Sequence, residues 1–418
     1  MKNIYRFNFF ILFISVVFFF PAVTFAAENP FPSLSAAAAI LMDQDTGTVL
    51  YSLNPDKKLP MASTTKVMTA VIALEEGKDK FGDRVVVSKK AGETEGSSYL
   101  REGETVLFGD LFKAALIVSS NEAAVAMAEY LCGSEDKFVE LMNKRALELG
   151  MTNTHYVNSH GLYDENHYSS ARDLVVLGRY VYQNCSLITE TAYMGYPEAV
   201  VIKAEPRGEV TLKNKNKMLS IKIPGVPDAK GIGLKTGYVQ KAGRCLISAA
   251  ERDGLRLIAV VLGSTPEYFN ESADILSYGF RNSYVVAADN TDIAGAKISI
   301  KNGKTDLLVG VDKTLYVPKE LASKDEKIIV RYEGKTPSAP ILKGDVLPGD
   351  IVLLKGDDVL SRRSAVALSS VEVSYVKLWG KIVVAASLAL VILIIGVRVY
   401  ATTAKSTGKR RSSVEKES

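Results

Sequence analysis

The sequence predicts an α+β fold: an antiparallel sheet covered by helices, with a helical subdomain beside it, then a small all-β domain and a C-terminal transmembrane helix. Three observations support this prediction. Two strand patterns precede a largely helical region over residues 110–181, an alternating pattern resumes after residue 235, and short β-branched runs fill residues 288–374. The order of these segments, rather than any one of them, predicts this architecture.

The first elements are two strands and a helix. Apolar stretches at 39–42 and 49–51 flank the polar segment Asp43–Gly47, which is typical of a hairpin. Apolar residues at helical spacing then follow Ser63 and end at Gly77. Helical apolar faces recur in three later segments, at residues 110–118, 121–131 and 170–181.

After residue 235 the apolar period changes to two. Segments 245–250 and 255–262 are predicted to be consecutive antiparallel strands, and a helix is expected from Thr265 to about Phe280 with Pro266 in its first turn. Residues 288–374 contain short strands separated by turns, which predicts a small all-β module. Since this module has no convergent reactive residues, we interpret it as a spacer or contact domain.

Both ends of the chain have membrane signals. The N-terminus has Lys2 and Arg6 before an apolar run, which is typical of a secretory signal peptide. A second apolar run spans Leu378–Tyr400, and the tail after it is rich in Lys and Arg, so the positive-inside rule places that tail in the cytoplasm. The expected organisation is a signal peptide (1–26), a catalytic domain (27–285), an all-β membrane-proximal domain (286–376), a transmembrane helix (378–400) and a basic cytoplasmic tail (401–418).

Composition excludes several classes of function. The formal net charge of +4 is small and lies mostly in the chain ends, so nothing favours nucleic-acid binding. The three cysteines give no disulfide framework. The three histidines lack the spacing of a zinc-protease motif, and no Cys/His cluster has metal-ligand spacing. We therefore expect no cofactor, no metal and no nucleic-acid partner.

Three short motifs stand in an order that indicates nucleophilic catalysis. Ser63-Thr64-Thr65-Lys66 comes first, Ser119-Ser120-Asn121 second and Lys235-Thr236-Gly237 third. The Ser-x-x-Lys pattern alone is a weak signal, because it also begins at Ser134, Ser374, Ser406 and Ser413. Only the Ser63 copy opens an apolar helix just after a strand pair and precedes both other motifs at domain-scale distance.

The residue types fit serine acyl transfer. A serine hydroxyl is a weak nucleophile until a base takes its proton, and Lys66 lies one helical turn after Ser63, within reach of its hydroxyl. Burial and the positive charge of Lys235 would favour a neutral Lys66, as a base requires. Ser119 can relay a proton toward the leaving amine. Asn121 can orient Lys66 or bind the substrate amide.

The third motif supplies substrate contacts. Lys235 places a positive charge beside the site, Thr236 offers a hydroxyl to a substrate carboxylate, and Gly237 lets a substrate backbone approach the strand edge. The backbone N–H groups of Ser63 and Tyr238 would form the oxyanion hole. The predicted catalytic residues are Ser63, Lys66 and Ser119, and the predicted substrate-binding residues are Asn121, Lys235, Thr236, Gly237 and Tyr238.

This motif set is that of the penicillin-recognising serine enzymes. The chain resembles a low-molecular-weight penicillin-binding protein, a serine-type D-alanyl-D-alanine carboxypeptidase, over about residues 35–374, and the likeness includes Asn158–Leu162 and Ala242–Cys245. The resemblance implies the serine β-lactamase/transpeptidase-like fold and removal of the terminal D-alanine from peptidoglycan stem pentapeptides through an acyl-enzyme on Ser63, with β-lactam antibiotics as inhibitors. The signal peptide and the apolar run predict a single-pass protein of the bacterial cell membrane, with its catalytic domain on the extracytoplasmic side. This span is unlike the amphipathic C-terminal helix of many relatives.

Two positions depart from the pattern of that family. Val239 stands where many members have Thr, and Tyr268 stands where many have an Arg that anchors the terminal carboxylate of the substrate. Either Arg244 or another basic residue takes this role, or turnover is weak, or the substrate has no free carboxylate. A peptidoglycan endopeptidase and a low-activity penicillin-binding scaffold on the same fold remain alternatives. A class A β-lactamase is disfavoured because the deacylating E-x-x-L-N motif is absent from the sequence.

Overall fold

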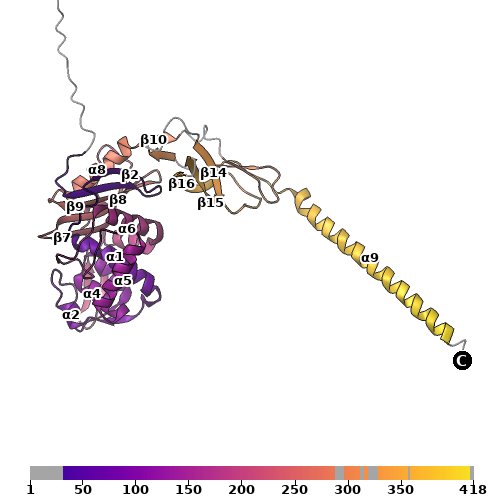
Figure 1. The fold of residues 1–418 in the computed structure, drawn as a ribbon, viewed down its shortest axis with the longest axis horizontal. Helices are drawn as coiled ribbons and strands as arrows, with labels where there is room; N and C mark the ends of the chain where they lie inside the picture. Colours follow the sequence, from indigo (N-terminus) through magenta and orange to yellow (C-terminus); the bar gives the residue numbers. More distant parts are fainter. Residues whose placement is uncertain (1–31, 288–295, 311–314, 319–327, 356–357, 415–418) are drawn as a thin grey trace, which may run out of the picture.

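The computed structural model describes residues 32–287, 296–310, 315–318, 328–355 and 358–414. Figure 1 shows a body of helices and strands (residues 32–283), a second domain built of strands (residues 284–374), and a long helix that leads away from it. The expected signal peptide lies outside the described residues.

A five-stranded antiparallel sheet with the order β2-β1-β9-β8-β7 forms the centre of the body. Its strands are β1 (Ala38–Asp43), β2 (Val49–Leu53), β7 (Lys230–Val239), β8 (Gly243–Arg252) and β9 (Leu255–Ser264). Because β1 pairs with both β2 and β9, the N-terminal hairpin joins the C-terminal strands in one sheet. The strand β7, which contains the third motif, forms one edge.

Helices cover both faces of this sheet. Side chains of a strand alternate between the two faces, so Leu246 of β8 belongs to the core beneath α8 (Tyr268–Asn282), and Ile247 belongs to the core beneath α6 (Ala171–Asn184). The helix α8 begins at Tyr268 rather than at Thr265, and Pro266 lies in the turn before it instead of in its first turn.

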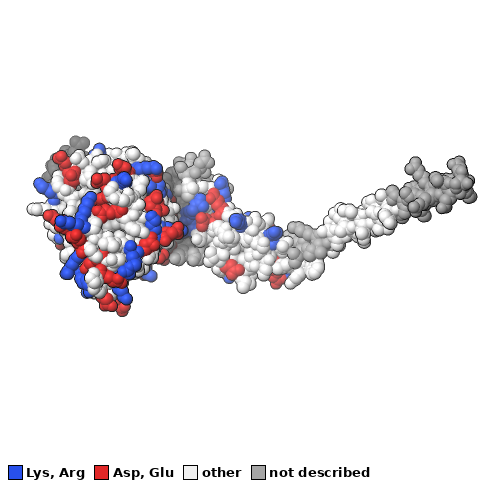
Figure 2. All heavy atoms as spheres, turned by 90° about the horizontal axis from the view of Figure 1, so that it is seen from below, with Lys and Arg blue, Asp and Glu red and all other residues white. Residues whose placement is uncertain are grey.

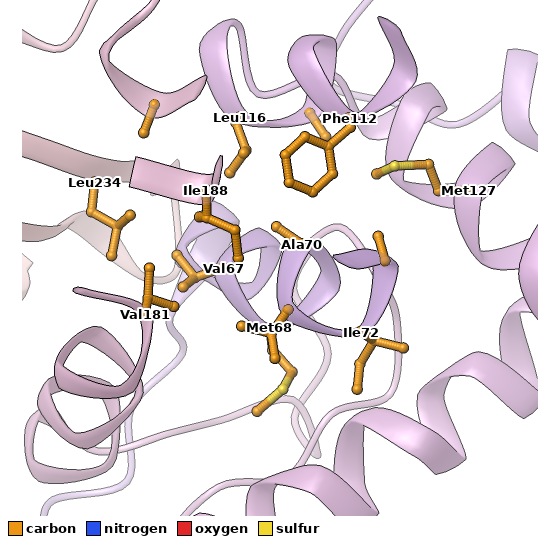
Figure 3. Close-up of a cluster of buried hydrophobic side chains, with 14 of the residues drawn as sticks. Val67, Met68, Ala70, Ile72, Phe112, Leu116, Met127, Val181, Ile188 and Leu234 are labelled. Carbon is orange, nitrogen blue, oxygen red and sulfur yellow. The ribbon is translucent and has the colours of Figure 1, made fainter. Parts of the chain in front are cut away.

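A helical subdomain stands beside the sheet, and α1 (Lys66–Gly77) lies at its centre. Apolar residues surround α1: Figure 3 shows Val67 and Ala70 among side chains from the neighbouring helices and from Leu234 of β7. Residues 66–73 of α1 are all buried, whereas Glu75 and Glu76 near its end are exposed. The other elements of the subdomain are α2 (Lys89–Gly92), α3 (Phe108–Ile117), α4 (Asn121–Cys132), α5 (Glu135–Glu148) and α7 (Ser186–Tyr193).

Several short elements were not predicted from the sequence. Two antiparallel strand pairs form separate two-stranded sheets: β3 (Arg84–Val86) with β4 (Thr105–Leu107), and β5 (Val200–Ala204) with β6 (Gly208–Leu212). Short 3-10 turns are η1 (Ala62–Thr65), η2 (Lys78–Lys80) and η3 (Lys217–Leu219).

The second domain is a sheet module, as the β-branched runs predicted. Five strands pair in the order β11-β12-β16-β15-β14, and β10 pairs with β13. Their bounds are β10 (Tyr284–Ala287), β11 (Ala296–Ile298), β12 (Leu307–Gly310), β13 (Leu315–Pro318), β14 (Ile328–Gly334), β15 (Val346–Lys355) and β16 (Asp358–Ala367). An ion pair joins this domain to the body, between Arg363 of β16 and Asp45 in the β1–β2 turn.

The last element is the long helix α9 (Tyr375–Val414). Within the described residues it is the one helix that is long and apolar enough to cross a bilayer, and its window Val383–Tyr400 has a mean hydropathy of 2.5. Figure 2 shows acidic and basic side chains interspersed over the body, whereas the described surface of α9 is almost free of charge. The apolar run in the sequence is thus a continuous, exposed helix.

Candidate active site

Ser63 lies in η1, directly before α1, and lines a cavity of about 530 Å³. Two hydroxyl groups hold this turn, because Thr64 donates to the carbonyl of Met61 at 2.7 Å and Thr65 donates to the carbonyl of Ala62 at 2.8 Å. Ala62 has a φ of 49°, in the left-handed region. The chain therefore turns sharply just before Ser63 and presents its hydroxyl to the cavity.

The amine of Lys66 is buried and has three oxygen neighbours. Its Nζ lies 3.0 Å from Ser63 Oγ, 2.6 Å from Asn121 Oδ1 and 2.6 Å from the carbonyl oxygen of His160. Burial, and then the charge of Lys235, hold the pKa of Lys66 well below its usual range. A neutral amine has two N–H donors and one lone pair. It can donate to the two nearer oxygens and accept the proton of the Ser63 hydroxyl.

The second motif connects α3 to α4. Ser119 has a φ of 64° and lines the cavity, while the side chain of Ser120 caps α4 by accepting from the N–H of Ala123 at 3.1 Å. The amide of Asn121 accepts from Lys66 through its oxygen and donates through its nitrogen to the carbonyl of Glu95 at 2.5 Å. Because both ends of this amide are bound, its orientation is fixed.

A buried acid beside this motif, Glu122, was not predicted from the sequence. The carboxylate of Glu122 accepts hydrogen bonds from the hydroxyls of Ser97 and Ser120 and from the N–H of Tyr99. It therefore fastens the loop Gly96–Tyr99, which lines the cavity, to the start of α4. Its charge also favours the protonated form of Lys66 and so opposes the effect of Lys235. The one sequence signal was an acidic residue directly after the second motif, in the first turn of a predicted helix.

The edge strand β7 passes closely over Ser63. A Cβ at Gly237 would lie 2.9 Å from the backbone nitrogen of Ser63, so a side chain does not fit there without displacement. Lys235 is buried and donates to the carbonyl of Thr236 at 3.0 Å, and burial lowers the pKa of its ammonium to about 7. Tyr238, by contrast, is 55% exposed and lines the cavity.

A tight loop aims the carbonyl of His160 at Lys66. The side chain of Asn158 accepts from the N–H of Gly161 at 2.6 Å, and Glu135 binds both the backbone and the hydroxyl of Ser159. Gly161 has a φ of 93°, and a Cβ there would lie only 2.1 Å from the carbonyl oxygen of Ala62. The three motifs predict no role for this loop, although the family resemblance includes it.

Two basic residues line the large cavity itself, and neither belongs to the three motifs. Arg244 of β8 lies opposite Tyr238 of β7, and its guanidinium is 4.1 Å from the ring centroid of Tyr238 and 5.7 Å from that of Tyr268. Lys215 is the other basic lining residue, and no Asp or Glu is among the described lining residues. The cavity therefore favours an anionic ligand.

The structure brings the eight predicted site residues together. Six of them line the large cavity: Ser63, Ser119, Asn121, Thr236, Gly237 and Tyr238. Lys66 lies behind Ser63 in contact with it. Lys235 lines a smaller cavity of about 100 Å³ together with Ser119 and Thr236.

The sheet, the helical subdomain and this serine–lysine centre define a serine acyl-transfer enzyme of the penicillin-binding class. The model of peptidase family S11, D-alanyl-D-alanine carboxypeptidase, matches residues 23–265. The chain belongs to this family of serine-type peptidases, which confirms the family, the fold and the enzyme class predicted from the motifs.

Relatives and solved structures agree with this assignment. The D-alanyl-D-alanine carboxypeptidase DacF of Bacillus subtilis is 35% identical over 343 residues, which cover 79% of this chain and 85% of the relative. The structure of penicillin binding protein 5 from Haemophilus influenzae has a TM-score of 0.56 at 29% identity and covers 82% of this chain and 99% of its own. Penicillin-Binding Protein D2 from Listeria monocytogenes, in its cefotaxime-bound form, has a TM-score of 0.51 at 28% identity and covers 60% and 100% of the two chains.

Proposed function

We propose that this protein removes the terminal D-alanine from peptidoglycan stem pentapeptides, with Ser63 as the nucleophile and Lys66 as its base. The observation that supports these roles best is the position of the Lys66 amine, 3.0 Å from Ser63 Oγ and within 2.6 Å of two further oxygens. The family assignment supports the reaction class.

In the acylation step, Lys66 takes the proton of the Ser63 hydroxyl as Oγ attacks the carbonyl carbon of the penultimate D-alanine. The negative charge that develops on the carbonyl oxygen is bound by the backbone N–H groups of Ser63 and Tyr238. The peptide C–N bond then breaks, and the amine of the terminal D-alanine leaves with a proton relayed through Ser119. Water hydrolyses the Ser63 ester in the second half of the cycle and regenerates the hydroxyl.

Substrate binding uses the edge of β7 and the basic lining of the cavity. Gly237 lets β7 lie directly against Ser63, so that a substrate backbone on the strand edge meets the nucleophile, and Asn121 contacts the substrate amide. Lys235 and Thr236 face the terminal carboxylate. Since no acid is among the described lining residues, the summed field of the cavity attracts the anionic end of the stem peptide.

β-Lactam antibiotics enter the same acylation step, because the lactam carbonyl meets the same nucleophile. The cefotaxime-bound relative supports this part of the proposal. We also propose that the protein is exported and anchored by α9, with its catalytic domain outside the cytoplasm, the second domain as a membrane-proximal spacer and the basic tail inside.

The test is a labelled penicillin together with a pentapeptide ending in D-Ala-D-Ala. Peptide mass spectrometry should locate the penicilloyl ester on Ser63, and free D-alanine should appear from the pentapeptide. Ser63→Ala should lose both activities, whereas Ser98→Ala, at another lining serine, should keep them. An ester on a different serine would refute the assignment.

The endopeptidase alternative differs only in the leaving group. It is favoured by Tyr268, which lines the cavity where many family members have a carboxylate-binding Arg. A crosslinked stem-peptide dimer, compared with the pentapeptide at equal concentration, separates the two activities: faster cleavage of the dimer would favour the endopeptidase.

A further inference from the structure

Two of the most exposed large apolar side chains lie four residues apart in the second domain. Val346 is 73% exposed, the highest value for such a residue among the described residues outside α9, and Leu342 is 66% exposed. Single exposed apolar residues are normal on a protein surface. Here two of them stand on either side of one tight turn, in which Gly344 has a φ of 96°. Together they form a small apolar projection on the surface of the domain.

This turn is held in shape by hydrogen bonds. The N–H of Leu342 donates to the Asp345 carboxylate at 2.8 Å, and the N–H of Asp345 donates to the carbonyl of Leu342 at 3.1 Å. The N–H of Gly344 donates to the carbonyl of Ala367 at 2.8 Å. Because the backbone is fixed in this way, Leu342 and Val346 cannot turn inward without breaking these bonds.

The turn lies at the end of the domain from which α9 emerges. Ile341 and Val371 exchange backbone hydrogen bonds at 3.0 and 2.8 Å, and the N–H of Lys343 donates to the hydroxyl of Ser370 at 3.0 Å. The helix begins shortly afterwards, at Tyr375. Figure 1 shows loops of the second domain beside the first turn of α9.

The distance to the candidate span is short. At 1.5 Å per residue, the path from Tyr375 to Val383 rises about 12 Å along the helix, and the headgroup zone on each side of a bilayer is about 5–8 Å thick. Tyr375 is 65% exposed and Trp379 is 58% exposed, which is typical of aromatic residues at a membrane interface.

The charges at this end are mainly basic. Lys301, Lys304 and Lys343 are exposed. The acid Glu372 pairs with Lys304, and the carboxylate of Asp345 is used within the turn. Both acids keep their charge, so the three lysines and two acids leave a net charge of +1, a small contribution toward contact with anionic lipid headgroups.

We propose that the turn Leu342–Val346 inserts its two apolar side chains into the headgroup region of the bilayer that α9 crosses. The second domain then has two membrane contacts rather than one. A single helix leaves the domain free to tilt, whereas a second contact fixes the direction in which the body stands above the membrane. This inference rests on the proposed anchoring by α9, and its test separates the two.

The chain contains a single tryptophan, Trp379, which makes fluorescence a direct test. The full chain is reconstituted into phosphatidylethanolamine–phosphatidylglycerol vesicles with and without brominated lipid, which quenches tryptophan on contact. The wild type reports on Trp379. A Val346→Trp variant in a Trp379→Phe background reports on the turn. The matched control is Leu147→Trp in the same background, at a position that is 70% exposed on the body.

We expect brominated lipid to quench the wild type and the Val346→Trp variant, and to leave the Leu147→Trp variant unchanged. If brominated lipid quenches the wild type but neither the Val346→Trp nor the Leu147→Trp variant, the inference is overturned and the anchoring by α9 stands. An unquenched wild type would overturn the anchoring as well. An emission shift of Val346→Trp that depends on protein concentration in detergent would assign the turn to a second copy of the chain and overturn the lipid contact. Retained labelling by penicillin shows that each variant is folded.

Discussion

Replacing Arg244 with Gln tests how this protein recognises the end of its substrate. With Tyr268 and Val239 at the two positions where the family pattern has carboxylate contacts, recognition falls to another cation. Arg244 lies in the cavity between the rings of Tyr238 and Tyr268, and no acid is among the described lining residues. Since the guanidinium is always protonated, it is a permanent charge, whereas burial lowers the pKa of Lys235 to about 7.

The magnitude follows from two contributions. A hydrogen bond to a charged group is worth about 1.5–3 kcal/mol, so Arg244→Gln should lower kcat/KM for a substrate with a free terminal carboxylate by roughly ten- to 150-fold. Loss of the contact with the Tyr238 ring costs about 0.5–1 kcal/mol at an exposed site. That loss is common to all substrates and should lower kcat/KM for the terminal amide by no more than about fivefold.

The assay compares the free acid and its amide, with the released D-alanine or D-alaninamide measured by chromatography. The wild type should prefer the acid, and Arg244→Gln should lose most of that preference. Lys215→Gln, at the other basic lining residue, should change it little. Adding Tyr268→Arg to Arg244→Gln should restore it. Equal losses for acid and amide, or no loss, would refute a carboxylate contact by Arg244.

Three further predictions concern the site and the anchor. Because the pKa of Lys235 is lowered to about 7, its charge is present below that pH and lost above it, so the preference for acid over amide should fall as pH rises through 7, and Lys235→Arg should abolish this fall in the measured ratio. Gly161→Ala should lower the free energy of unfolding by about 1–3 kcal/mol more than Gly208→Ala in thermal unfolding, because both have positive φ but only the first places a Cβ 2.1 Å from the carbonyl oxygen of Ala62; equal losses would show that the loop yields. A chain truncated after Val376 should be secreted in soluble form and still bind penicillin, whereas the full chain should resist carbonate extraction; full-length protein released by carbonate would contradict the span.

Local patterns in the sequence determined the class of element at each motif. The spacing of Ser63 and Lys66 corresponds to one helical turn, and their side chains meet at 3.0 Å. The alternation after Lys235 corresponds to the strands β8 and β9. The apolar run near the C-terminus corresponds to the exposed helix α9. In each case the periodicity of the side chains records which face is buried, and this information is local.

The short strand pairs could not be predicted from the sequence, because they contain no local periodicity. The strands β3 and β4 have only three residues each, which is too short for a period to appear. The strand β3 pairs with β4, and the chain reaches β4 only after the loop of residues 87–104. The start of α8 shifted to Tyr268 because the local turn before it, and not the proline signal, determines where helical bonding begins.

Only the tertiary structure decided what surrounds the serine and the lysine. The carbonyl of His160, the carboxylate of Glu122 and the guanidinium of Arg244 reach the site through loop closure, helix packing and the register of β8 against β7. Each of these contacts joins segments far apart in the chain, and a shift of one residue in register would turn Arg244 to the other face of the sheet. The sequence by itself determined the reactive pair Ser63 and Lys66, because a spacing of three residues places their side chains within one helical turn. The charges and oxygens that set the protonation of Lys66 come from tertiary packing, which no local pattern in the sequence records.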